Sequence, residues 1–91
     1  MHMAHRTQEE LRHELTEAAA LVEVGARYTH FKDPIKEYLV VGFVIIEATE
    51  EVGVLYEAQY DERITFVRPL QSFIAPVEHE GTTTMRFIKV A

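Results

Sequence analysis

A chain of 91 residues provides material for one domain with a small core. The absence of cysteine excludes disulfide bonds and thiolate chemistry, so we expect a cytoplasmic protein without a signal peptide. The longest apolar run, Tyr38–Ile46, is shorter than the ~20 residues of a membrane span. The net charge of −6 disfavours nucleic acid as a partner, although a local basic patch could still bind it.

The first predicted element is an amphipathic helix over residues 7–24. Thr7 and Glu10 have the spacing of a capping box, in which each side chain accepts a hydrogen bond from the other residue's backbone N–H. Apolar residues then recur at helical spacing and form one stripe, widened by Ala4 and Ala19: Leu11, Leu15, Ala18 and Val22. Gly25 is suited to end the helix. We therefore expect a helical extension at residues 1–24 and a small β-barrel domain at residues 25–91.

After Gly25 the hydrophobic pattern changes to the period of two that is typical of strands. Strands are predicted at residues 26–32, 38–47, 52–60 and 64–68, and Asp33-Pro34 is expected to stop the first of them. A helical turn at residues 69–73 precedes two last strands, 74–79 and 85–90, which are expected to pair across Gly81 and three threonines. The predicted fold class is mainly β (α+β): an N-terminal helix, then a five- to six-stranded antiparallel, SH3-like barrel or bent sheet.

The strand predicted at residues 38–47 is apolar on both faces. Strict alternation directs two sets of side chains to opposite sides: Tyr38, Val40, Val44 and Ile46 against Leu39, Val41, Phe43 and Ile45. Both sides should then be covered, because burying a leucine-sized side chain contributes about 1.5–3 kcal/mol. We expect the stripe of the helix, from the same chain or from a second copy, to cover one side.

Several short motifs follow one another over residues 25–90. They are Tyr28-Thr29-His30-Phe31-Lys32, Tyr38-Leu39-Val40, Leu55-Tyr56-Glu57-Ala58-Gln59-Tyr60 and Phe66-Val67-Arg68-Pro69-Leu70-Gln71-Ser72-Phe73. Their order resembles the bacterial family known as domain of unknown function 1653. The resemblance implies a compact, mostly β, SH3-like domain and implies no activity, because the family has none assigned. The helix lies outside the matched region.

Two departures from the family pattern bear on the shape of any shared pocket. This chain has Asp33-Pro34-Ile35 where the family usually has a glycine-bearing loop. It also has Phe66 where the family usually has tryptophan.

The strands at 52–60 and 64–68 supply the candidate ligand contacts. Tyr56 and Tyr60 share one face of the first, and Phe66 and Arg68 share one face of the second. If these faces lie on the same side of the sheet, they form an aromatic surface that ends in an arginine, suited to a peptide groove or to base stacking. The alternative is that these aromatic side chains fill the barrel interior.

Two of the candidate contacts have a purely structural alternative. His30 could hydrogen-bond a ligand or transfer a proton, but its ring could equally bond a neighbouring backbone group. Arg68 offers donors to a carboxylate or phosphate, but it could instead pair with Glu57 or Asp61.

Other chemistry has little support in the sequence. Glu9, His13 and Glu17 align on the helix, but by helix geometry His13 lies opposite the apolar stripe, so we interpret them as an exposed charge-paired face and expect no metal. Ser72 is the single serine and has no G-x-S-x-G motif around it, so no catalytic residue is assigned. The glycines form no phosphate-binding loop, and we expect no cofactor.

These observations predict a non-enzymatic binding module for a peptide or small polar ligand. The expected ligand-binding residues are His30, Tyr56, Tyr60, Phe66 and Arg68, and a homodimer is expected through the helix stripe. Two alternatives stay open: an RNA-associated SH3-like module, and a small-substrate enzyme that uses His30.

Overall fold

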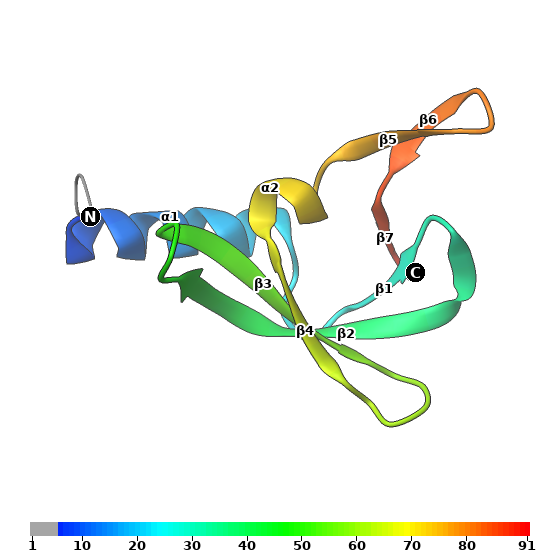
Figure 1. Cartoon of the computed structure of the whole chain (residues 1–91), viewed down its shortest axis with the longest axis horizontal. Helices are drawn as coiled ribbons and strands as arrows, with labels where there is room; N and C mark the ends of the chain where they lie inside the picture. Colours follow the sequence, from blue (N-terminus) through cyan, green and yellow to red (C-terminus); the bar gives the residue numbers. More distant parts are fainter. Residues whose placement is uncertain (1–5) are drawn as a thin grey trace.

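The computed structural model describes residues 6–91 and shows a helix packed on a bent antiparallel sheet (Figure 1). The elements are α1 (Gln8–Leu21), β1 (Arg27–His30), β2 (Asp33–Ile46), β3 (Glu51–Ala58), β4 (Thr65–Pro69), α2 (Leu70–Phe73), β5 (Pro76–His79), β6 (Thr82–Met85) and β7 (Phe87–Lys89). Five strands form the main sheet in the order β4-β3-β2-β1-β7, and β5 with β6 forms a separate hairpin that projects from the body. The mainly β fold with an N-terminal helix is confirmed.

The main sheet is open, so the expected closed barrel is wrong and the bent sheet is the correct alternative. β4 and β7 are the two edges, and among residues 6–91 no strand pairing joins them. β7 is only 3 residues long and pairs with β1 alone, which leaves too short a ladder to close the sheet.

The helix begins as predicted and ends earlier. The Glu10 N–H donates to Thr7 Oγ1 at 3.0 Å and the Thr7 N–H donates to Glu10 Oε1 at 2.8 Å, which completes the capping box. The backbone is already extended at Val22, three residues before Gly25. Gly25 does adopt a positive φ of 89°, but it does so in the turn that leads to β1.

The apolar stripe of α1 packs on the sheet of its own chain. Ala18 and Val22 are buried, and Leu15 packs against the same cluster, which includes Val40 and Val54. We call this side of the sheet the inner side. Leu11 is half-buried and Ala19 is exposed, while Ala4 lies outside the described residues. The stripe through which a homodimer was expected is therefore largely occupied within the chain, and the dimer itself stays a prediction.

A β-bulge in β2 overturns the predicted alternation. Val40 lies opposite Tyr56, yet Gly42 lies opposite Leu55, so Val41 is an extra residue in β2. Beyond the bulge, Phe43 and Ile45 change sides and pack against the inner core with Val40.

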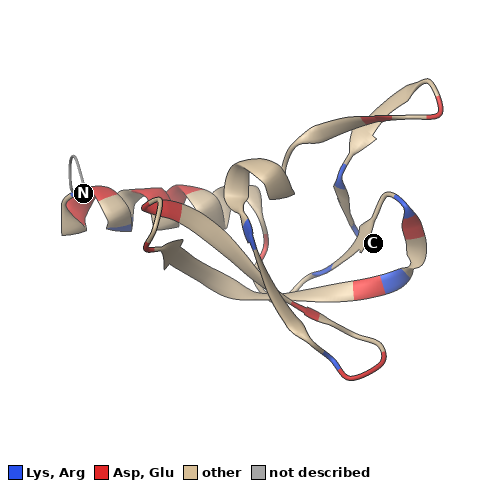
Figure 2. Ribbon diagram, viewed as in Figure 1, with Lys and Arg blue, Asp and Glu red and all other residues tan. Residues whose placement is uncertain are grey.

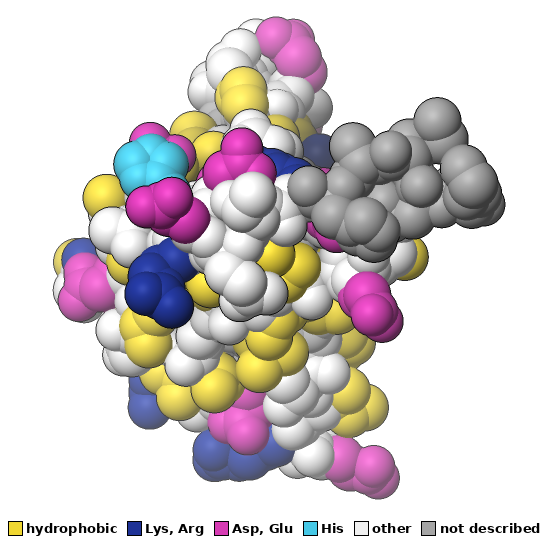
Figure 3. All heavy atoms as spheres, turned by 90° about the vertical axis from the view of Figure 1, so that its left-hand side faces the viewer, with side chains coloured by type: hydrophobic (Ala, Val, Ile, Leu, Met, Phe, Trp, Pro, Cys, Tyr) yellow, Lys and Arg dark blue, Asp and Glu magenta, His cyan; other side chains and the backbone are white. Residues whose placement is uncertain are grey.

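The outer side of the sheet, opposite α1, carries apolar residues that the described chain leaves half-exposed. A Cβ built at Gly53 would approach the side chains of Val67 at 2.7 Å and Ile46 at 3.0 Å, which places both residues on this side. Val67 is 50% exposed, and Val41 at the bulge is 47% exposed. At the end of the molecule that lies on the left of Figure 1, hydrophobic side chains are likewise visible at the surface, in the central and lower parts of Figure 3. Within the described chain, the helix thus covers the inner side of the strand, whereas cover for the outer side by a second copy stays a prediction.

The strand boundaries require two more corrections. Asp33 and Pro34 begin β2 instead of separating two strands, because proline is tolerated at the start of a strand. The threonines at 82–84 form β6, which pairs with β5, whereas β7 pairs with β1. The last predicted strand, residues 85–90, is thus divided between two sheets.

The charges are distributed unevenly over this framework. Asp and Glu are concentrated along α1 and in hairpin turns, whereas Lys and Arg lie mostly on the β half of the molecule (Figure 2). Within residues 6–91, no helix is long and apolar enough to cross a membrane.

Candidate functional site

Strand pairing brings the predicted contact residues together on the inner side of the sheet. Phe66 lies opposite Tyr56, and Arg68, two residues further along β4, points to the same side. On the other flank, His30 of β1 lies opposite Phe87 of β7. The condition for a shared aromatic surface that ends in an arginine is therefore fulfilled.

A hollow of about 330 Å³ lies between these strands. Its walls include all the predicted contacts except Tyr60: His30, Tyr56, Phe66 and Arg68. Three further residues line it that sequence reasoning did not select: Asp33, Tyr38 and Phe87. We call this hollow the aromatic pocket.

Arg68 reaches the aromatic pocket with its charge unpaired. Its Nη1 donates to Ser72 Oγ at 3.0 Å and its Nε donates to the Tyr56 hydroxyl at 3.4 Å. Its guanidinium carbon lies 5.4 Å from the centre of the Phe87 ring. In the part of the chain that the structure describes, no carboxylate lies within 4.0 Å of this guanidinium. The neutral partners orient the side chain without cancelling its charge.

The ion pair considered for Arg68 in the sequence does not form. Glu57 points away from Phe66 and Arg68 in the alternation of the two strands, and its Oε1 accepts from Gln59 Nε2 at 2.9 Å. Asp61 lies in the turn between β3 and β4, with a positive φ of 50°. The arginine is thus free to bind an external anion.

His30 has both a structural contact and a face on the aromatic pocket. Its Nδ1 accepts the backbone N–H of Lys32 at 3.2 Å, so the neutral ring carries its proton on Nε2. Burial lowers the pKa of His30, and the nearby positive charges of Arg68, Arg86 and Lys32 lower it further. The imidazole is therefore a neutral N–H donor near pH 7.

Tyr60 supports the aromatic pocket from outside. Its hydroxyl lies 2.6 Å from the hydroxyl of Tyr38, which lines the pocket. Burial, together with the hydrogen bond to Tyr60, raises the pKa of Tyr38 to about 12. Tyr60 therefore does not line the pocket but contacts Tyr38, which does, and its role as a ligand contact stays a prediction.

The floor of the aromatic pocket is continuous with the core. The Phe73 and Phe87 rings stack with centroids 4.2 Å apart, and Tyr56 meets both at 5.4–5.5 Å. Phe73 and Tyr56 are buried. Both sequence interpretations of the aromatic residues thus hold in part, since Tyr56 belongs to the core while Phe66 stays exposed at the rim.

The sequence did not reveal these three residues, for separate reasons. Asp33 is expected to stop a strand but begins β2, and Phe87 belongs to a segment that is expected to pair with residues 74–79 but pairs with β1. Tyr38 was assigned to a strand that was apolar on both faces, which gave no indication of a pocket. Asp33 Oδ1 accepts the Ile35 N–H at 3.3 Å and its Oδ2 lies 3.9 Å from Lys36 Nζ, so it forms a polar rim.

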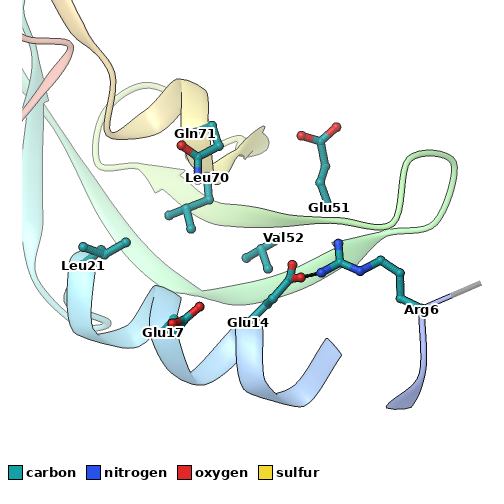
Figure 4. A pocket seen from close by; sticks show the side chains of 8 residues that line it. All are labelled: Arg6, Glu14, Glu17, Leu21, Glu51, Val52, Leu70 and Gln71. Carbon is teal, nitrogen blue, oxygen red and sulfur yellow. Dashed lines mark ion pairs between the residues drawn. The ribbon is translucent and has the colours of Figure 1, made fainter. Parts of the chain in front are cut away.

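A larger hollow of about 400 Å³ lies between α1, β3 and α2 (Figure 4). It contains none of the predicted contacts and is lined by three carboxylates, of Glu14, Glu17 and Glu51. Its single arginine, Arg6, is paired with Glu14. The aromatic pocket is the better candidate, because its arginine has no such partner.

The charged face of α1 is as the sequence predicts. His13 Nε2 lies 3.4 Å from Glu17 Oε2, and both side chains are exposed. Among residues 6–91, no group of three or more His, Cys, Asp or Glu residues is arranged to hold a metal ion.

Comparisons with known proteins agree on the family. The model of a family described as a protein of unknown function, DUF1653, matches residues 26–89. A crystal structure of a DUF1653 protein from Bordetella bronchiseptica is similar in fold, with a TM-score of 0.63 and 26% sequence identity over 72% of this chain and 85% of that one. No curated protein matches the chain. The match covers all the strands that build the aromatic pocket and excludes α1, and the chain therefore belongs to the DUF1653 family.

Proposed function

We propose that this protein is a binding module whose aromatic pocket recognises a peptide or small ligand through an anionic group. The observation that carries the proposal is Arg68, which lines the pocket and has no carboxylate partner in the described residues. A ligand carboxylate or phosphate would supply the missing charge through a charge-assisted hydrogen bond.

The rest of the pocket restricts the ligand further. The exposed ring of Phe66, with Phe87 and Tyr56, offers an apolar wall for an aromatic or aliphatic group. The Asp33 carboxylate accepts hydrogen bonds, so it favours a ligand that also carries a donor. The C-terminal residue of a peptide combines a carboxylate, an N–H group and a side chain. We propose it as the simplest ligand of this kind.

Calorimetric titration with N-acetyl-phenylalanine and with its amide tests the proposal. The two probes share their ring and their N–H and differ in the carboxylate that Arg68 should bind. We expect the acid to bind and the amide to bind more weakly. In Arg68→Gln the acid should lose about 10- to 100-fold in affinity, the contribution typical of a hydrogen bond to a charged group.

Arg63→Gln is the matched control, because Arg63 lies in the exposed turn before β4 and its Nη1 bonds only Gln59 among the described residues. This substitution removes the same charge from the protein at a distance from the pocket, so the variant should bind the acid with the affinity of the unchanged protein. Equal affinity for acid and amide, or unchanged binding in Arg68→Gln, would show that the pocket does not recognise an anion through this arginine.

An RNA-associated module is the second candidate. Aromatic rings beside an arginine also suit a nucleotide, whose base could stack on Phe66 while its phosphate meets Arg68. The net charge of −6 works against a long polyanion. A nucleoside 5′-monophosphate that binds more tightly than N-acetyl-phenylalanine, together with salt-dependent binding of single-stranded RNA, would favour this candidate.

Binding is better supported than catalysis at His30. Its Nδ1 is engaged by a backbone N–H, and Ser72, the single serine, accepts a hydrogen bond from Arg68. Within residues 6–91, no hydroxyl is hydrogen-bonded to the imidazole as a nucleophile to a base. We therefore assign His30 the role of a ligand hydrogen-bond donor through Nε2.

A further inference from the structure

The outer edge of β4 has an unpaired backbone and an apolar surface. In the described part of the chain, β4 ends the main sheet and pairs with β3 alone. The Ala58 N–H donates to the Ile64 carbonyl at 2.9 Å, which fixes the alternation of the ladder. Phe66 and Arg68 therefore direct their backbone groups to β3, whereas the N–H and C=O of Thr65 and Val67 point outward. In the described chain no other strand or side chain bonds these outward groups.

The first part of this edge, residues 64–67, carries none of the charges that natural sheets often place on free edges, and Arg68 and Pro69 follow only at its end. Ile64, Phe66 and Val67 are 56%, 41% and 50% exposed, and no charge interrupts residues 64–67. β4 has no bulge, and its proline, Pro69, is its last residue. The opposite edge, β7, is only 3 residues long and carries Lys89. An uncharged, exposed apolar stretch at a free edge favours pairing with another strand.

We infer that β4 pairs antiparallel with β4 of a second copy of this chain, about a twofold axis at Phe66. In this register Thr65 lies opposite the partner's Val67, and Val67 lies opposite the partner's Thr65. Each of these pairs exchanges two hydrogen bonds, so all the outward groups of both residues are satisfied in both copies. A twofold axis at Thr65 or at Val67 uses fewer of these groups, because the next pair then includes Arg63 or Pro69, and Pro69 has no N–H.

The same register adds a residue to the aromatic pocket. Phe66 and the partner's Phe66 form a directly opposed pair on the inner side, with Cα atoms about 4.5 Å apart. Phe66 is a pocket residue that lies on the edge strand β4 itself. The partner's Phe66 would extend the apolar wall at the open rim, so each pocket would be completed by the other copy.

The oligomeric state in solution tests the interface. A pair of five-residue strands buries less surface than a standard protein–protein interface, which covers about 1,600 Å². The dimer should therefore be weak, and its population should rise with protein concentration. We expect sedimentation equilibrium to show this, and Val67→Lys to raise the dimer dissociation constant about tenfold or more. Ile88→Lys places the same charge at a comparably exposed apolar position on the opposite edge and should leave dimerisation unchanged. A monomer at every concentration, or equal effects of the two variants, would refute the interface.

Disulfide crosslinking tests the register directly. The chain has no cysteine of its own, so any crosslink must join the introduced cysteines. In Phe66→Cys the two cysteines lie at a distance that a disulfide can span, so oxidation should produce a covalent dimer. In Thr65→Cys the two cysteines are diagonal neighbours about 7–8 Å apart, too far for a disulfide. Efficient crosslinking of Thr65→Cys but not of Phe66→Cys would overturn the proposed register. A strand from another protein at this edge would appear as loss of the dimer on addition of that protein.

Discussion

At the residue scale, the aromatic pocket depends on an arginine that is held in place without being neutralised. Ser72 and Tyr56 orient Arg68 through neutral oxygens, and the Phe87 ring lies beside its guanidinium. Burial lowers the pKa of His30, and the positive charge of Arg68 lowers it further. The pKa of His30 is therefore a measurable signal of the local electrostatic field.

The lowered pKa of His30 makes a prediction about stability. Because the unfolded chain binds the proton more readily than the folded chain, the free energy of unfolding should fall as pH drops from the ordinary histidine value of 6.5 through the lowered value. His30→Gln removes the titrating imidazole, so the part of the pH dependence that it causes should disappear. Urea unfolding curves measured from pH 7 down to a pH below the lowered pKa of His30 give the free energy of unfolding that checks this. The same slope in the variant would contradict the assignment.

At the element scale, period-two patterning identified the strands and the shared face of β3 and β4. It could do so because Tyr56, Phe66 and Arg68 lie on regular, bulge-free stretches, where alternation alone fixes the side. The bulge at Val41 was not predictable in this way, because an extra residue leaves no mark in the alternation of a uniformly apolar strand. Asp33 and Phe87 were missed because their strand partners are set by tertiary pairing.

The capping box of α1 gives a direct test of how that helix is held. Thr7→Ala removes the side-chain oxygen that accepts the Glu10 N–H and should cost about 1 kcal/mol of stability in chemical denaturation. Thr16→Ala is the matched control, since Thr16 lies on the exposed part of the same helix and its hydroxyl donates to the carbonyl of Arg12 within that helix. A loss in Thr7→Ala no larger than in Thr16→Ala would mean that the cap does not stabilise the helix. Because α1 lies outside the pocket, ligand binding by the folded fraction should not change.

At the scale of the whole molecule, the aromatic pocket is a product of the bend in the main sheet. Its walls come from β1, β2, β3, β4 and β7, so residues far apart in the sequence meet only when the sheet is complete. The helix covers the remaining inner surface near Val52 and Val54, which divides the inner side into a closed core and an open pocket. The family match over residues 26–89 includes every residue that lines the pocket, together with the strand side of the core, and leaves out α1. In the proposed function the pocket is the functional centre of the fold, and α1 covers the core.

The most direct test of the central claim is an NMR titration of the His30 ring with and without a bound probe. If an anion binds beside Arg68, it offsets part of the positive field, and the pKa of His30 should rise when N-acetyl-phenylalanine is bound. The amide of the same compound should leave that pKa nearly unchanged. A pKa of His30 that responds equally to both compounds, or to neither at saturation, would contradict an anion site at Arg68.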